Sequence, residues 1–319
     1  MAADAGAIDV VCIGETMALF RAEASGPLTH ARAMTLGIGG SESNVAVGLT
    51  RLGARAAWVG GVGTDSLGEL IVHELLGEGV EVVALRHPTA PTGVMIKERR
   101  TPATQQVTYY RSGSAGSAIR PEDLPVVLLQ GTRILHLTGI TPALSESAAE
   151  TVIRAIDIAK HAGATVSFDI NHRTALWRER DAGSDLRPLI ADSDIVFAGP
   201  EEAAMVVGLG TPEEQADRLG ALGPREVVIK QGAAGALALV DGRVYRQAAI
   251  PIQPVDTVGA GDAFVAGYLA ELLAGEPADR RLLTAVRTGA FACLVPGDWE
   301  GFPRRADLGL LETSESVAR

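Results

Sequence analysis

The stretch V-D-T-V-G-A-G-D-A-F, residues 255–264, decides how this chain of 319 residues is interpreted. Gly259 and Gly261 precede a carboxylate, Asp262, and a run of small apolar residues follows. Glycine lets the backbone approach a ligand closely, and the first N–H groups of a helix have no partner within that helix. The stretch therefore predicts an anion-binding turn at a helix N-terminus, with a carboxylate beside it to accept a proton. A purely structural turn between a strand and a helix is the alternative.

Two other glycine patterns are incomplete in this chain. Phe264 stands where the G-x-G-x-x-G fingerprint of dinucleotide-binding folds requires its third glycine, so a nicotinamide oxidoreductase has weak support. No Gly-Lys dipeptide occurs anywhere in the sequence, which excludes a Walker-type phosphate loop.

The chain is acidic, with 28 Lys and Arg residues against 39 Asp and Glu residues and a net charge of −11. A protein of this sign repels the phosphates of nucleic acids and anionic lipids, so we expect neither nucleic acid nor a membrane as a partner. Hydrophobic residues make up 47% of the chain, which is enough for a large core. The start of the chain lacks the features of a signal peptide, and Cys12 and Cys293 lie in apolar runs, so we expect a cytoplasmic protein without disulfides.

Short apolar runs alternate with longer amphipathic runs along most of the chain. This order predicts one large α/β unit with a mainly parallel sheet covered by helices on both faces. Ligands bind such folds at the carboxyl ends of the strands. The expected strands are 8–13, 56–60, 134–137, 165–169, 195–198, 226–230 and 236–240, and the expected helices are 43–52, 66–77, 145–162, 213–221, 259–274 and 280–294.

Two segments interrupt this alternation. Residues 17–36 and 92–111 are rich in β-branched and alternating residues, and no helix follows them, so they predict antiparallel strand pairs. Together they are expected to form a small lid over the strand ends, with an edge extension of the main sheet as the alternative. The α/β core then consists of residues 1–16, 37–91 and 112–319.

The segment D-T-V-G-A-G-D resembles the C-terminal signature of the ribokinase-like (PfkB) carbohydrate kinases. An N-terminal signature of that family is matched by G-G-S-E-S-N-V-A-V-G-L-T-R-L-G (39–53) and V-G-G-V-G-T-D-S-L-G (59–68). The resemblance implies a three-layer sandwich with a β lid and a kinase that uses ATP and Mg²⁺, with K⁺ as a further candidate ion. It also implies that Asp262 is the catalytic base and that the amides of Gly259, Ala260 and Gly261 form an anion hole for the γ-phosphate.

Within that family, Y-Y-R-S-G-S-A (109–115) and D-I-N-H-R-T-A-L-W (169–177) are similar to the 2-keto-3-deoxygluconate kinases. These kinases phosphorylate the primary hydroxyl of a sugar acid, and arginine binds carboxylates through paired N–H donors. Surface ion pairs are the alternative for each arginine. The resemblance implies sugar contacts from Gly39, Gly40, Asn44, Tyr109, Arg111 and Arg173, and nucleotide contacts from Lys230, Gly232, Gly235, Gly289 and Ala290.

The resemblance also implies that Glu202 organises magnesium through water, although an acidic residue at a helix start is often only a cap. The sequence departs from the family at several positions: Met95 replaces a frequent aromatic residue, Gly199-Pro200 replaces an asparagine, an asparagine is missing near Val286 and Arg287, and Ser41 and Ser43 flank Glu42. The alternatives are a ribokinase-like kinase of a neutral sugar or nucleoside, such as fructose or ribose, and a non-catalytic sugar-binding member of the fold. Exposed lid strands also predict a homo-oligomer, a dimer or larger.

Overall fold

The computed structural model describes residues 7–101 and 104–312. The ends of the predicted core, 1–6 and 313–319, and residues 102–103 of the predicted lid lie outside this range. None of the helices in the described part of the chain has the length and apolarity that a membrane span needs. Cys12 and Cys293 are buried free thiols, as predicted.

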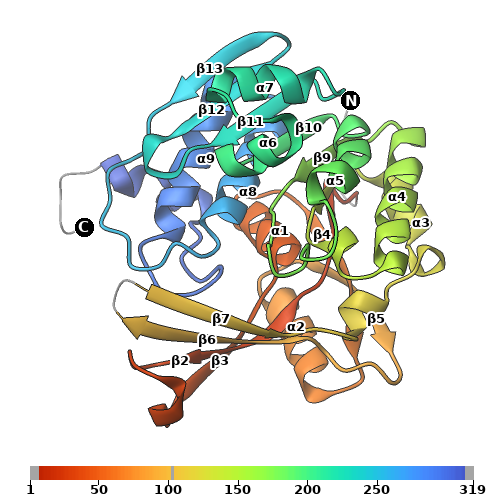
Figure 1. Ribbon diagram of the computed structural model, residues 1–319, viewed down its shortest axis with the longest axis vertical. Helices are drawn as coiled ribbons and strands as arrows, with labels where there is room; N and C mark the ends of the chain where they lie inside the picture. Colours follow the sequence, from red (N-terminus) through yellow and green to blue (C-terminus); the bar gives the residue numbers. More distant parts are fainter. Residues whose placement is uncertain (1–6, 102–103, 313–319) are drawn as a thin grey trace.

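A mainly parallel sheet runs through the centre of the molecule (Figure 1). Within the described ranges it has nine strands in the order β13-β12-β11-β10-β9-β8-β1-β4-β5. The strands from β11 to β5 are parallel, whereas β12 pairs antiparallel with β11, and β13 with β12. The bounds are β1 (Val10–Ile13), β4 (Ala56–Gly63), β5 (Glu81–His87), β8 (Ile134–Thr138), β9 (Thr165–Asp169), β10 (Ile195–Ala198), β11 (Glu226–Lys230), β12 (Ala236–Val240) and β13 (Arg243–Gln247).

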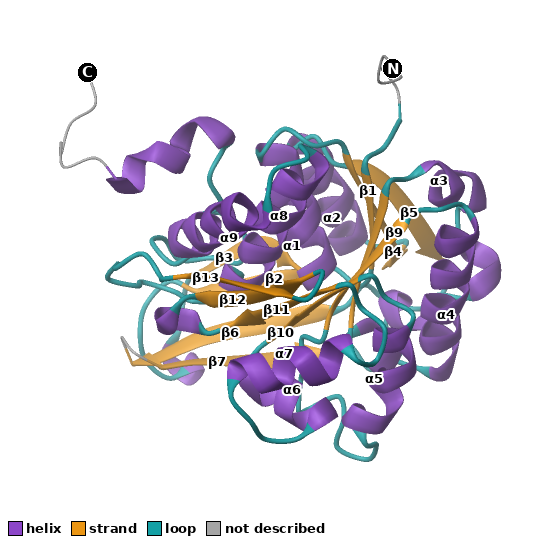
Figure 2. Ribbon diagram, turned by 90° about the horizontal axis from the view of Figure 1, so that it is seen from above, coloured by secondary structure: helices purple, strands orange, loops and turns teal. Residues whose placement is uncertain are grey.

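Helices cover both faces of this sheet and complete the predicted three-layer sandwich (Figure 2). The sequence V-V-C-I of β1 illustrates the reason for cover on both faces. All four side chains are buried, and they point alternately to the two faces of the sheet, so each face needs an apolar layer. One face carries α1 (Ser41–Arg51), α2 (Ser66–Gly77), α8 (Ala260–Leu273) and α9 (Ala278–Ala292). The other carries α3 (Val126–Gly131), α4 (Glu146–His161), α5 (Ala182–Ala191), α6 (Pro200–Val207) and α7 (Pro212–Gly220).

A second sheet stands apart from the first and forms the lid (Figure 1). Its order is β3-β2-β6-β7, and the bounds are β2 (Met17–Ala22), β3 (Met34–Gly39), β6 (Val94–Thr101) and β7 (Thr104–Tyr110). The β2–β3 and β6–β7 pairs are antiparallel, as expected, while β2 and β6 join the two pairs in parallel. The lid is therefore no edge extension of the main sheet. Strand β3 continues to Gly39, three residues beyond the predicted segment 17–36.

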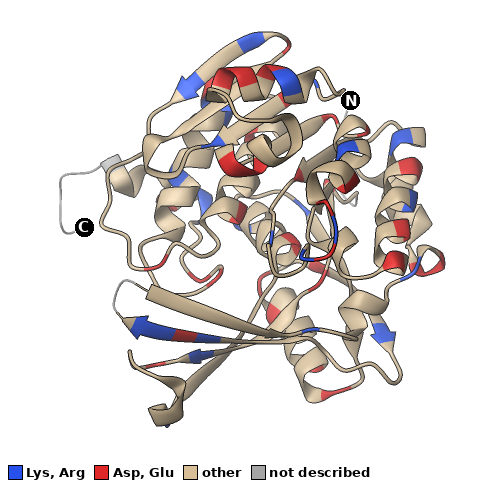
Figure 3. Cartoon of the chain, in the orientation of Figure 1, with Lys and Arg blue, Asp and Glu red and all other residues tan. Residues whose placement is uncertain are grey.

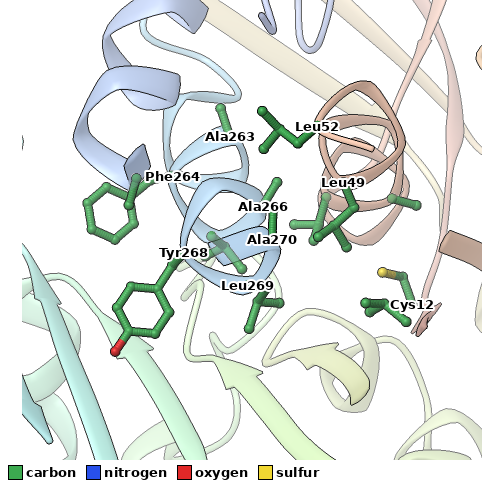
Figure 4. Packing of buried hydrophobic residues seen from close by; sticks show 14 of the residues in the cluster. Cys12, Leu49, Leu52, Ala263, Phe264, Ala266, Tyr268, Leu269 and Ala270 are labelled. Carbon is green, nitrogen blue, oxygen red and sulfur yellow. The ribbon is translucent and has the colours of Figure 1, made fainter. Parts of the chain in front are cut away.

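Helices α1 and α8 pack closely through small residues. Figure 4 shows Ala266 and Ala270 of α8 on the side that faces α1, which contributes Leu49 and Leu52. A methyl group on Gly48 would lie 2.6 Å from Cβ of Ala266, so glycine is required for this helix separation. The contact brings the beginnings of the two helices together, and with them two motifs that are more than 200 residues apart in sequence.

Candidate active site

Asp262 lies in the first turn of α8, and its carboxylate is held by α1. The hydroxyl of Ser41 donates to Oδ1 at 2.7 Å, and Nδ2 of Asn44 donates to Oδ2 at 2.8 Å. Burial raises the pKa of Asp262 above its ordinary 3.8, while these two donors and the nearby charges of Arg173 and Lys230 act in the opposite direction. The result is a fixed carboxylate with an increased proton affinity, which suits a general base.

The glycine turn before Asp262 presents backbone N–H groups. Gly259 caps α8 in the left-handed region, with φ of 76°. Among the described residues, the N–H groups of Gly259 and Gly261 have no acceptor, while the N–H of Ala260 makes a long bond of 3.4 Å to the Thr257 carbonyl oxygen. Gly261 is exposed, and the other two residues are half-buried. The turn is thus free to bind an anion at the positive end of the helix dipole.

A salt bridge between two strand ends lies beside this turn. Nζ of Lys230, the last residue of β11, is 2.6 Å from Oδ2 of Asp169, the last residue of β9. Burial raises the pKa of Asp169 to about 6 despite the lysine. Burial lowers the pKa of Lys230, but Asp169 and Glu202 outweigh it and raise the pKa above 10.5. A methyl group on Gly261 would lie only 3.7 Å from Nζ, so the ammonium group of this salt bridge lies directly beside the turn.

The two arginines of the sugar-acid prediction lie in different environments. Arg173 is exposed, influences the pKa of Asp262, and has no ion-pair partner among the described residues. Arg111 is buried and forms two short contacts with Oε2 of Glu15, from Nε at 2.7 Å and from Nη2 at 2.6 Å. The charge of Arg111 is therefore already compensated, and Arg173 is the better available partner for a ligand carboxylate.

Residues of the predicted sugar pocket come from the lid and from the start of α1. Gly40 caps α1, and its N–H faces Oδ1 of Asn44 at 3.5 Å. A methyl group on Gly39 would lie 2.4 Å from both Met95 Cε and Asp298 Oδ2, so a side chain there has no room. Met95 pairs with Tyr109 across β6 and β7, and the Arg111 guanidinium lies 5.7 Å from the Tyr109 ring centroid. The lid thus places Tyr109 and Met95 side by side.

The predicted nucleotide residues flank the same turn. Gly232 and Gly235 follow β11 and adopt positive φ of 56° and 100°. Gly289 of α9 packs against α8, where a methyl group would lie 3.3 Å from the Ala260 carbonyl oxygen. Ala290 next to it is buried. After Ala290 the chain continues into a loop, where Asp298 contacts Lys97 of the lid.

Glu202 caps the start of a helix, which is the alternative to a magnesium role that the sequence left open. Its Oε2 accepts from the N–H of Gly199 at 2.6 Å at the start of α6, and its Oε1 accepts from the N–H of His172 at 2.9 Å. Within the described ranges no group of three or more His, Cys, Asp or Glu side chains could hold a metal ion alone. Both carboxylate oxygens of Glu202 thus accept from backbone N–H groups.

The structure adds several residues to the site that the sequence did not assign to it. In the sequence Ser41 is only a small polar residue at a position where the family usually has an apolar one, yet its hydroxyl donates directly to the predicted base Asp262. Asn171 donates to the Ser41 hydroxyl at 2.5 Å and has a left-handed φ of 38°. Glu42 lies behind them, accepts from Thr138 and Thr141, and has a pKa that burial raises to about 7. The only sequence signal was that these polar residues follow apolar runs or open a helix.

Comparison with known proteins points to one family. The model of the pfkB family carbohydrate kinases matches residues 7–305. The chain is 36% identical over 305 residues to a 2-dehydro-3-deoxygluconokinase of Bacillus subtilis (strain 168), with 94% of each protein covered. It is 34% identical over 293 residues to a 2-dehydro-3-deoxygalactonokinase of Haloferax volcanii, covering 91% of this chain and 92% of that protein.

Among solved structures, the PfkB protein from Polaromonas sp. JS666 superposes with a TM-score of 0.87 at 34% identity, over 95% of this chain and 99% of that one. The predicted ribokinase-like fold and the predicted phosphotransferase class are thereby confirmed, and with them an enzyme in place of the non-catalytic alternative. The fold, the two signatures and the glycine turn lead to one conclusion: this chain belongs to the pfkB family of carbohydrate kinases.

Proposed function

We propose that this kinase transfers the γ-phosphate of ATP to the primary hydroxyl of 2-keto-3-deoxygluconate and forms the 6-phosphate. The observation that carries the proposal is the position of Asp262, fixed by Ser41 and Asn44 next to the free N–H groups of the glycine turn. A base beside an anion hole is what phosphoryl transfer to an alcohol requires, since the protein mainly positions groups and neutralises charge.

In this mechanism Asp262 accepts the proton of the attacking hydroxyl. The N–H groups of Gly259 and Gly261 and the ammonium group of Lys230 stabilise the negative charge on the transferring phosphoryl group. Magnesium, when bound with the nucleotide, neutralises phosphate charge. Glu202 would hold it through water, and the absence of a protein-only ligand cluster among the described residues fits an ion that binds mainly to phosphates.

The choice of a sugar acid rests on Arg173. It is an exposed cation near the base, without a carboxylate partner among the described residues, and it would bind the carboxylate of the sugar. Tyr109 and Met95 on the lid would close over the sugar, while the backbone at Gly39 and Gly40 would contact its hydroxyl groups. The epimeric keto-deoxygalactonate is the second candidate, because one relative of similar identity bears that name.

An assay of ADP release with Mg-ATP tests the proposal. The substrates are 2-keto-3-deoxygluconate, its galactonate epimer, gluconate, fructose and ribose. We expect turnover with the keto-deoxy acids only. The variant Asp262→Asn should fold normally and lose about 100-fold or more in kcat, because a positioned base contributes that much. Turnover confined to fructose or ribose would reject the sugar acid, and full activity of Asp262→Asn would reject the base.

The homo-oligomer expected from the lid stays a prediction. Leu36 and Tyr110, at opposite edges of the lid sheet, are 47% and 62% exposed. Analytical ultracentrifugation of the full chain tests it, and a single species of monomer mass would reject it.

A further inference from the structure

Lid strand β6 carries a buried cation that the proposed chemistry does not use. Nζ of Lys97 lies 2.8 Å from Oδ2 of Asp256 and 3.4 Å from Oδ1 of Asp298. The three side chains are only 3%, 2% and 9% exposed. Figure 3 shows the acidic loops of the core opposite the basic end of the lid sheet. One ammonium group therefore joins the lid to two separate loops of the core.

Both carboxylates belong to segments that hold the glycine turn. Oδ1 of Asp256 accepts from the N–H of Val258 at 3.0 Å, one residue before Gly259, and Oδ2 accepts from the N–H of Gly297 at 3.3 Å. The carbonyl oxygen of Asp298 lies against Gly259, where a methyl group would be only 1.8 Å away. Movement of either loop would therefore move the turn.

The same cluster also reaches the sugar side of the site. Oδ2 of Asp298 would lie 2.4 Å from a methyl group on Gly39, a residue of the predicted sugar pocket. Asp298 thus contacts the lid through Lys97, the anion-binding turn through Gly259, and the sugar-binding loop through Gly39. The relative positions of the two substrates depend on where this one residue lies.

Charge makes Lys97 necessary for this arrangement. Burial raises the pKa of Asp298 to about 6 even with Lys97 beside it. Burial has the same effect on Asp256, but hydrogen bonds from Lys97 and from the N–H of Val258 hold its pKa below 3.8. Two buried carboxylates without a cation repel each other, and an unpaired buried charge is strongly unfavourable. Removal of the ammonium group would separate the two loops or protonate Asp298.

We propose that Lys97 is a positioning residue for phosphoryl transfer. By holding Asp256 and Asp298 together, Lys97 fixes the position of the N–H groups of the glycine turn relative to the bound sugar. This inference rests on the proposed function of the glycine turn. The ammonium group of Lys97 is buried between Asp256 and Asp298, so its effect on the turn passes through these two aspartates. Its effect falls on the transition state, because the turn binds the charge of the phosphoryl group in transfer.

The test compares Lys97→Met with Arg100→Met. Both remove one positive charge from β6, but the Arg100 side chain is 48% exposed and its ion pair with Glu98 is long, at 3.7 Å. We expect Lys97→Met to lower kcat about 10- to 100-fold, since a small misplacement of catalytic groups has that effect, while KM for ATP changes little. Arg100→Met should retain wild-type kcat. Lys97→Met with wild-type kcat and only a lower melting temperature would overturn the inference.

Chemical rescue adds a readout that a purely stabilising lysine would not give. Lys97→Ala leaves space for a small cation, so ammonium or methylammonium should restore kcat, whereas tetramethylammonium at equal ionic strength should not. Equal effects of all three ions would contradict the inference. If Lys97→Met alone does not fold, the double variant with Asp298→Asn buries one charge fewer and is measured in its place, with the same expected loss of kcat.

Hydrogen exchange separates this inference from the proposed function. The peptide that covers residues 255–264 should exchange faster in Lys97→Met than in wild type or Arg100→Met, whatever the sugar. If the wild type phosphorylates no sugar of the panel, the proposed function fails, but faster exchange still supports the role of Lys97. If the wild type is active and Lys97→Met matches it in both exchange and kcat, only the inference fails.

Discussion

The hydroxyl of Ser41 donates a 2.7 Å hydrogen bond to Asp262, a residue 221 positions away in the sequence. This bond stabilises the ionised form of Asp262 and opposes the effect of burial on its pKa. We predict that Ser41→Ala raises the pKa further and moves the acid limb of the kcat profile to higher pH. Ser43→Ala is the matched control, because that hydroxyl donates to the Gly40 carbonyl oxygen and not to Asp262. Equal shifts in both variants would contradict the assignment.

Arg111 and Arg173 should respond differently to removal. Arg111→Ala leaves the fully buried carboxylate of Glu15 without its cation, which should lower the free energy of unfolding by about 3–5 kcal/mol. Arg173→Ala should leave stability unchanged and raise KM for sugar acids about 10- to 100-fold, the value of a hydrogen bond to a charged group. Urea denaturation and initial rates measure the two effects. An equal rise of KM for ATP in Arg173→Ala would reject its role toward the sugar.

Gly259 and Gly275 offer a matched pair of substitutions. Both have φ of 76°, so Gly→Ala imposes the same conformational strain of about 1–2 kcal/mol at each. At Gly275 the methyl group has open space, whereas at Gly259 it collides with the Asp298 carbonyl oxygen. We expect Gly259→Ala to lose about 100-fold or more in kcat through displacement of the turn, and Gly275→Ala to retain it. Similar kcat values in the two variants would show that the turn tolerates displacement.

His136 should make the protein sensitive to acid. Its ring is fully buried on β8, Nδ1 lies 3.0 Å from the Ser167 hydroxyl, and burial lowers the pKa to about 3. The unfolded chain binds a proton near pH 6.5, so this residue's contribution to stability is complete above pH 6.5 and is lost as pH falls toward 3. When the pH falls from 7 to 5, the free energy of unfolding of His136→Leu should decrease by up to about 2 kcal/mol less than that of the wild type. Parallel pH curves for the two proteins would contradict the buried neutral state.

The sequence predicts the central strands better than the edges. Seven strands expected from continuous apolar runs are present, because strands buried on both faces must be apolar throughout. Strands β5 and β13 were not predicted, and they are the two edges of the main sheet. Their sequences, E-V-V-A-L-R-H and R-V-Y-R-Q, are only partly buried, so no continuous apolar run marks them.

The helices show a similar limit. Helix α5 was missed because Pro188 stands inside it, which normally argues against a helix. Helix α6 is short and follows Gly199-Pro200, where a proline at the first position starts a helix. The expected helices 43–52 and 280–294 begin two residues late, since Ser41 and Ala278 open the helices without a strong cap signal.

The sequence marks several residues of the candidate site but not the contacts that support them. Asp262, the glycine turn and Lys230 carry local signals, such as glycines before a helix or a polar residue at a strand end. The partners of these residues do not. Neither the bond from Ser41 to Asp262 nor the contacts of Lys97 with Asp256 and Asp298 can be deduced from spacing, because each joins elements that only the fold brings together.

The absence of a side chain at Gly48 has a consequence for how this kinase withstands heat. The helices that hold Ser41 and Asp262 meet there so closely that a methyl group on Gly48 would lie 2.6 Å from Cβ of Ala266 and 3.3 Å from the Phe302 ring. Asp262 and its hydrogen-bond donor Ser41 are thus attached to two helices that pack within the hydrophobic core. Local fraying does not reach such a region before cooperative melting does. We therefore expect the activity lost on heating to follow the cooperative unfolding of the core and not to precede it.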